Sequence, residues 1–147
     1  MLVPLLLLTN LATTLFMTGL IWFVQVVHYA MFADVGCDVF TAYHTKHMSR
    51  TTWVVAPIMI VEGIAGVLFP FFAPGVLRPL GWFALTMLVL VWISTFAMQV
   101  PRHNQLHRNG FDAACCGRLC RTNWVRTFGW TARAIVLLWI TWRLIVR

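Results

Sequence analysis

The chain has 147 residues and is very apolar: 61% of its residues are hydrophobic, only 10% are charged, and the mean hydropathy is +0.81. Soluble domains carry roughly 25% charged residues. Eleven basic and four acidic side chains cannot cover the surface of a water-soluble protein of 16.8 kDa. This composition excludes a soluble domain, a disordered chain and a nucleic-acid-binding module, and it indicates one integral membrane domain over residues 1–147.

Four long apolar stretches predict four membrane-spanning helices. They lie at about residues 3–32, 40–72, 80–100 and 123–145. The first stretch has no charged residue before Asp34 and is too long for the apolar core of a signal peptide, so we expect a retained helix. Pro57 is expected to kink the second helix and Pro101 to end or bend the third, while Asn123 is expected to cap the fourth.

The predicted fold is all-α, a four-helix transmembrane bundle with up-down-up-down order, because each connection is short enough to join neighbouring helices. A polar cytoplasmic connection over 102–122 is expected between the third and fourth helices. Basic residues are concentrated near the first and third connections, and basic residues mark the cytoplasmic side. We therefore expect both termini outside the cytoplasm. The seven basic residues on that side are Lys46, Arg50, Arg102, Arg108, Arg118, Arg121 and Arg126, and the three on the other side are Arg78, Arg143 and Arg147.

Histidines are predicted to gather at the cytoplasmic end of this bundle. His28 closes the first helix, His44 and His47 lie in the first turns of the second, and His103 follows the third. Imidazole is a common transition-metal ligand, and bundles build metal sites from side chains on facing helices. The four histidines are therefore candidate metal ligands, although histidine is also an ordinary interfacial residue. His107 is a weaker candidate because it lies beside Arg108 in the polar connection.

Glu62 is the only acidic residue inside a predicted span, and Arg133 is the only basic residue in the apolar middle of one. Antiparallel helices place the two at the same height, level with Asn10 on the first helix. An ionised carboxylate inside a membrane is costly unless it is paired. Two interpretations follow: a buried ion pair between Glu62 and Arg133, or a proton-accepting or metal-binding carboxylate.

Several segments resemble small four-helix bacterial membrane proteins of the anthrone-oxygenase-like family. The resemblance is carried by WFVQVVHYAMFADVG, FTAYHTKHMSRTTWVVAPIMIVE, QVPRHNQL and TNWVRTFGWTARA. It implies a bacterial inner-membrane protein with redox chemistry in a pocket at the end of the bundle. The family usually has asparagines after the proline, whereas this chain has Arg102, His103 and Asn104, and its histidine set is richer. Both departures count against a polyketide anthrone as the substrate.

The leading functional hypothesis is a membrane-embedded oxidoreductase or oxygenase-like enzyme that acts on an apolar small molecule. Its metal, which the sequence does not identify as Fe, Cu or Zn, would be bound by histidines. Asn104, Asn123 and Arg126 would orient a polar group of the substrate. Two alternatives remain: a haem- or pigment-binding membrane protein, and a non-catalytic accessory subunit of a homo-oligomer or larger membrane complex.

Overall fold

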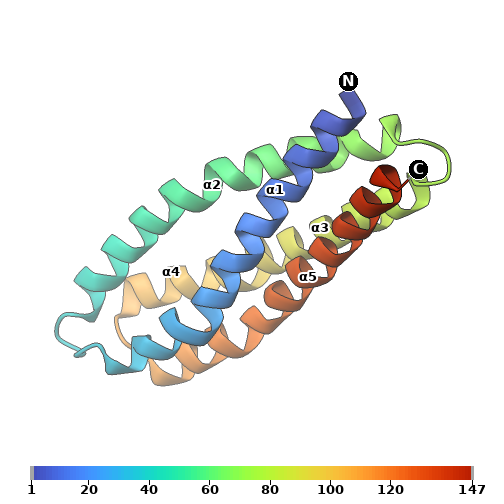
Figure 1. Ribbon diagram of the computed structural model, residues 1–147. Coiled ribbons are helices and arrows are strands. Elements are labelled where there is room, and N and C mark those ends of the chain that lie inside the picture. The colour runs from blue at the N-terminus through green and yellow to red at the C-terminus, as the bar shows by residue number, and fades with distance from the viewer. Residues whose placement is uncertain (1, 147) are drawn as a thin grey trace.

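The computed structural model describes residues 2–146, and nearly all of them are helical. Four helical stretches are long and apolar enough to cross a membrane, which confirms the predicted four-helix transmembrane bundle and makes this an integral membrane protein. These stretches are Leu2–Asp34, Phe40–Phe72, Arg78–Asn109 and Ala113–Ile145. The elements labelled in Figure 1 are α1 (Leu2–Phe23), α2 (Phe40–Phe72), α3 (Arg78–Ser94), α4 (Val100–Asn109) and α5 (Ala113–Ile145).

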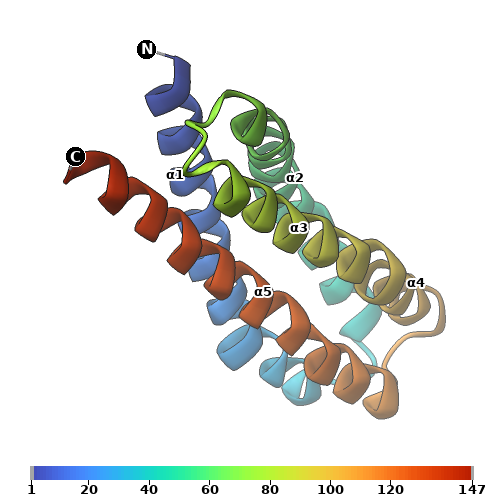
Figure 2. The same cartoon turned by 90° about the vertical axis from the view of Figure 1, so that its right-hand side faces the viewer.

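Each spanning helix packs against two neighbours. α1 and α3 each contact both α2 and α5, so the four helices surround a common core. The two termini and the α2–α3 connection lie at one end of the bundle (Figures 1 and 2). The α1–α2 and α4–α5 connections lie at the other end. We call it the histidine end, because His28 follows α1 there and His44 and His47 lie in the first turns of α2.

The outside of the bundle is apolar on all four helices. Large hydrophobic side chains such as Leu5, Ile64, Ile93 and Ile135 are more than half exposed. Soluble monomers rarely expose contiguous apolar surface on this scale, whereas a lipid bilayer covers it. Polar side chains are instead turned inward, into the region between the helices.

Two stretches of wider, π-helical turn interrupt the spans. The π-helix η1 (Val24–His28) follows α1 and is continued by the 3-10 helix η2 (Ala30–Asp34), and the π-helix η3 (Thr95–Gln99) joins α3 to α4. Pro101 at the start of α4 lacks an amide hydrogen and crowds the preceding turn, a situation that a wider turn relieves. The Arg102 guanidinium donates to the Met98 carbonyl at 2.5 Å in this same turn. The third span is therefore not ended by Pro101 and continues to Asn109.

The predicted polar connection over 102–122 is largely helical. α4 runs on to Asn109, and Gly110 ends it with a φ of 77°, a left-handed conformation that favours glycine. The physical reason is burial: Leu106 and Leu119 are completely buried in the core, so the segment packs against the bundle as helix.

The predicted N-cap at Asn123 is wrong. The last helix begins at Ala113, and the Asp112 carboxylate caps it by accepting hydrogen bonds from the amides of Ala114 and Cys115 at 2.8 and 3.0 Å. Asn123 lies inside α5, where it is completely buried. Asparagine suits both a cap and a buried polar contact, and the second role applies here.

Candidate functional site

Four of the five histidines lie against one another at the histidine end. His28 Nε2 is 2.8 Å from His47 Nδ1, and His44 Nε2 is 3.1 Å from His103 Nδ1. The two pairs are neighbours, because the ring centroids of His47 and His103 are 6.0 Å apart and those of His44 and His47 are 6.2 Å apart. We call these four residues the histidine quartet.

The quartet forms because three helical segments reach the same height. His44 and His47 are three residues apart in α2, a spacing that places both side chains on one face of a helix. His28 is the last residue of η1, and His103 follows Pro101 in α4. One histidine from each neighbouring segment thus meets the pair on α2.

Aromatic side chains fix the orientation of the quartet. The Phe32 ring meets His28 edge-on at a centroid distance of 5.2 Å, and Phe40 stacks on His44 at 5.7 Å. Phe32 and Phe40 are completely buried. The Tyr29 hydroxyl lies 2.9 Å from His103 Nε2 and extends the second pair into a chain of three polar groups. His44 and His103 are buried among these rings, whereas His28 and His47 are half-buried.

A cavity of about 390 Å³ adjoins the quartet. Its walls are mostly apolar, and its polar side chains include Tyr29, His47, Gln99, His103 and Arg126. A cavity of about 300–1,000 Å³ with a few convergent polar groups is typical of small-molecule sites. The combination of imidazole rings, a phenol and a guanidinium in an apolar cavity makes this the candidate functional site.

Four buried polar atoms near this site have no hydrogen-bond partner among residues 2–146. They are His44 Nδ1, Gln99 Oε1, Arg126 Nε and the indole nitrogen of Trp92, which also lies at the cavity wall. A buried donor or acceptor without a partner costs about 1–3 kcal/mol, so natural proteins keep few of them without a purpose. Gln99 and Arg126 both line the cavity, and their free atoms can therefore bind the polar groups of a ligand.

The other predicted site residues are divided between this cavity and the rest of the bundle. Arg126 lines the cavity, and its guanidinium lies 5.4 Å from the Trp130 ring centroid. Asn123 is buried and donates to Gln25 Oε1 at 3.0 Å, but it does not line the cavity. Asn104 is exposed and does not line the cavity. The structure thus brings Arg126 to the histidines and leaves both asparagines away from the cavity.

Sequence reasoning missed two residues of the site, Tyr29 and Gln99. Tyr29 directly follows His28, and Gln99 immediately precedes the Val-Pro step of the third span. Their positions in the chain were a usable signal, because a polar side chain at the same height as the predicted metal ligands has the same reason to point inward. His107, by contrast, is exposed and lies 3.2 Å from the Thr45 hydroxyl, outside the quartet.

A second polar cluster, the Glu62 network, lies nearer the middle of the bundle. Arg133 Nη1 lies 2.6 Å from Glu62 Oε1, and both side chains are completely buried. Glu62 also accepts hydrogen bonds from the Thr14 hydroxyl at 2.8 Å and the Trp130 indole at 3.2 Å. Arg133 further donates to Asn10 Oδ1 and to the Thr14 hydroxyl, and its Nε donates to the Ala84 carbonyl at 3.1 Å. The structure therefore contains the buried ion pair, with Asn10 bound to it.

The quartet as it stands is two pairs and not a single four-ligand cage. Within residues 2–146, no group of three His, Cys, Asp or Glu side chains is arranged to hold a metal ion. The nitrogen separations of 2.8 and 3.1 Å are hydrogen-bond distances. They are also close to the spacing of about 3 Å between two nitrogens that bind one ion at about 2.0–2.1 Å. Each pair is therefore hydrogen-bonded, at a separation that two ligands of one ion also have.

Comparison of the chain with protein-family models, curated proteins and solved structures gives no match. The resemblance to the anthrone-oxygenase-like family therefore remains a prediction from short sequence motifs. The chemistry of the site itself must carry the functional argument.

Proposed function

We propose that the protein is a membrane-embedded oxidoreductase that binds a transition-metal ion through the histidine quartet and an apolar small molecule in the adjoining cavity. The observation that carries this proposal is the convergence of four imidazole rings from three helical segments, two of them, His47 and His103, lining the cavity. Imidazole nitrogens are ligands for iron, copper and zinc alike. A bound redox metal would supply one-electron or dioxygen chemistry next to the substrate.

The residues around the metal ligands have separate tasks in this proposal. Tyr29, bonded to His103, holds or moves a proton at its hydroxyl oxygen. Arg126 provides positive charge and a free Nε donor for an oxygen atom of the substrate. The apolar walls exclude water and strengthen these polar contacts.

An ion is favoured over haem by the spacing of the rings. Two axial histidines of a haem lie on opposite faces of the macrocycle, so a gap must separate them. Within each pair of the quartet the facing nitrogens are only 2.8 or 3.1 Å apart, which leaves no room for a macrocycle between them. Haem is therefore the second candidate cofactor, to be recognised by its absorption spectrum.

The test is elemental analysis together with an optical spectrum of protein purified from its own membrane. We expect bound metal in the wild-type protein, and loss of that metal in the His44→Ala and His103→Ala variants. His107→Ala is the matched control, because it removes an exposed histidine at the same end of the bundle and should retain the metal. A wild-type protein with neither metal nor pigment contradicts the proposal and favours an accessory subunit. A Soret band favours haem.

The proposal includes an orientation, with the histidine end in the cytoplasm of a bacterial cell and both termini outside the inner membrane. The unequal distribution of basic residues supports it. Cys37 is exposed in the connection between η2 and α2 and offers a direct probe. We expect an impermeant maleimide to label Cys37 in inverted vesicles but not in intact cells, with Cys37→Ser as the control. Labelling of Cys37 in intact cells would show the opposite orientation, with the histidine end outside the cytoplasm.

A further inference from the structure

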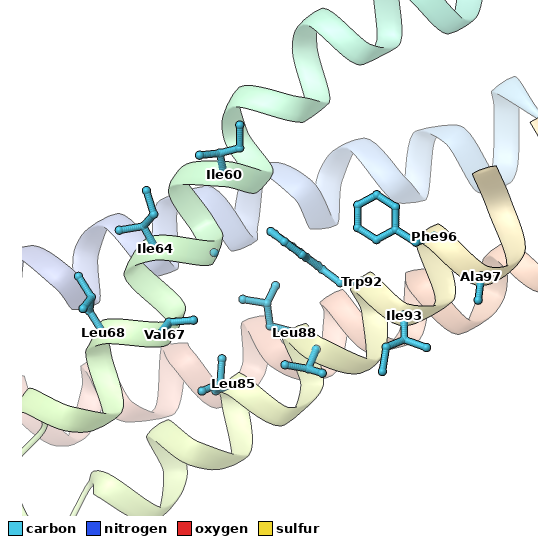
Figure 3. A pocket seen from close by; sticks show the side chains of 12 residues that line it. Ile60, Ile64, Val67, Leu68, Leu85, Leu88, Trp92, Ile93, Phe96 and Ala97 are labelled. Atoms are coloured by element: carbon cyan, nitrogen blue, oxygen red, sulfur yellow. The ribbon is translucent and has the colours of Figure 1, made fainter. Parts of the chain in front are cut away.

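A wide apolar groove of about 850 Å³ runs along the outer face of the bundle between α2 and α3 (Figure 3). Its lining extends from Leu68 and Leu85 at one end to Phe96 and Ala97 at the other. Every lining residue is apolar or glycine apart from Trp92, whose indole carries the single polar group. The groove lies where the bilayer would surround the protein, and its chemistry suits a hydrocarbon chain.

The groove adjoins the cavity beside the quartet. Ile60, Trp92 and Phe96 line both. In Figure 3 the Trp92 side chain reaches from α3 into the space toward α2. Gly63 makes this reach possible, because a Cβ at that position would stand 3.0 Å from the indole. A partly polar cavity inside the bundle therefore lies directly against an apolar groove on its surface, with these shared side chains at the boundary.

We propose that the cavity and the groove together bind one membrane amphiphile, a hydroquinone with a long alkyl or isoprenoid tail, with its ring in the cavity and its tail in the groove. This inference rests on the proposed function, because it names the substrate class of the same site. The cavity has polar groups that suit the ring hydroxyls, and the groove is apolar and suits the tail.

The cavity fits the head of this molecule. Arg126 Nε is a free donor and Gln99 Oε1 is a free acceptor, and both residues are at least nine-tenths buried. A phenolic hydroxyl both accepts and donates a hydrogen bond, so hydroquinone hydroxyls satisfy both atoms. The aromatic rings that line the cavity include Tyr29, Trp92 and Phe96, which offer faces and edges for a planar ring.

The groove fits the tail, and the size and position of the cavity disfavour a phospholipid or a second copy of this chain as the occupant. A phospholipid has a bulky charged head that belongs at the membrane surface, and a helix of a second copy cannot enter a cavity of about 390 Å³. A ring-headed amphiphile fills both compartments at once. It also has a route of entry, because the groove is open to the side of the bundle.

The experiment uses a photoreactive probe, a 1,4-benzohydroquinone with a ten-carbon tail that ends in a diazirine. The full-length protein in phosphatidylcholine nanodiscs is irradiated with a subsaturating amount of probe, and labelled peptides are mapped by mass spectrometry. We expect labels on the groove residues of α2 and α3. Val67→Trp should abolish this labelling, because Val67 lines the groove but not the cavity. Ile135→Trp, an equally bulky change on the exposed face of α5, is the matched control and should leave it intact.

Head binding is tested in the same assay with Arg126→Met and Gln99→Leu, which should each reduce labelling of the groove because the ring loses a partner. Circular dichroism and thermal unfolding of every variant identify those that fail to fold. Labels spread evenly over the outer faces of the helices overturn the inference. So does groove labelling that survives Val67→Trp, or equal labelling by a diazirine-bearing phosphatidylcholine.

Metal analysis of the same samples separates this inference from the proposed function. Groove labelling without bound metal supports the amphiphile site and contradicts the metal centre. Bound metal without groove labelling contradicts the amphiphile site and leaves the metal centre in place.

Discussion

The Glu62 network and the histidine quartet are two buried polar clusters in one bundle, and they differ in how completely their groups are partnered. In the Glu62 network, the carboxylate faces Arg133, Thr14 and Trp130, and the guanidinium contacts Asn10 as well. In the quartet, His44 Nδ1 has no partner among residues 2–146. The first cluster is closed by its own hydrogen bonds, whereas the second borders a cavity.

This difference separates a structural role from a binding role. Buried charges in a low-dielectric surrounding are tolerated when every group is paired and hydrogen-bonded, and such clusters fix which helices lie together. The Glu62 network joins α1, α2, α3 and α5 at one height, which suits it to specify the packing of the bundle. A cluster with an unpartnered nitrogen and adjacent space has capacity left for a ligand. The two clusters should therefore respond differently to mutation.

The largest expected effect is that of Arg133→Met. The change leaves the Glu62 carboxylate buried without its counter-charge, and breaking a buried pair in this way costs about 3–5 kcal/mol. Unfolding in mixed micelles of increasing SDS content measures the loss. The double variant Glu62→Gln with Arg133→Met should be more stable than Arg133→Met alone. If the double variant is no better, the pair is not what stabilises this region, and Glu62 becomes a candidate functional carboxylate.

A smaller loss is expected for Trp130→Phe. The indole donates to both oxygens of Glu62, at 3.3 and 3.2 Å, and phenylalanine keeps an aromatic ring but is smaller and removes the donor. Loss of one hydrogen bond to a buried charge costs about 1.5–3 kcal/mol. Trp139→Phe, at an exposed position on the same helix, is the control and should change the free energy of unfolding by less than about 0.5 kcal/mol. Equal effects at the two positions would contradict the assigned role of the indole.

The smallest effect on stability is expected for His44→Leu, despite the complete burial of His44. The substitution breaks the bond to His103 but also removes a nitrogen that has no partner, so the two contributions offset each other to within about 1 kcal/mol. Metal content should nevertheless fall. A loss of stability comparable to that of Arg133→Met would show that the quartet, too, is a structural cluster.

The height of polar residues in the membrane was predictable from the sequence. Glu62 and Arg133 are the only charges in the apolar middle of the predicted spans, and antiparallel order alone places them level with each other. The same reasoning gives one height for His28, His44 and His103. Height follows from the apolar run lengths, which the bilayer thickness dictates.

The direction of a side chain around its helix was not predictable in the same way. Asn104 and His103 are adjacent in the sequence, yet His103 is buried and Asn104 is exposed. The choice of Asn123 as a cap failed because polar and basic residues over 102–122 look like a loop, while buried residues such as Leu119 hold them in a helix. In both cases packing against other helices determines which residues are buried, and the local sequence pattern does not indicate that packing.

The π-helical turns η1 and η3 have a consequence for the spacing of residues along the chain. Each such turn accommodates one residue more than a regular α-helix would, and one residue corresponds to about 100° of rotation. The faces of α1 and of the segment that ends in His28 are therefore out of phase by one residue, and the same holds for α3 and α4. A helical periodicity that is continued through Val24 or Thr95 without a break therefore places His28 and His103 about 100° from their true direction around the helix. A one-residue deletion, in evolution or in the laboratory, has its natural place in these two turns, because the turn can close into regular helix while both flanks keep their orientation.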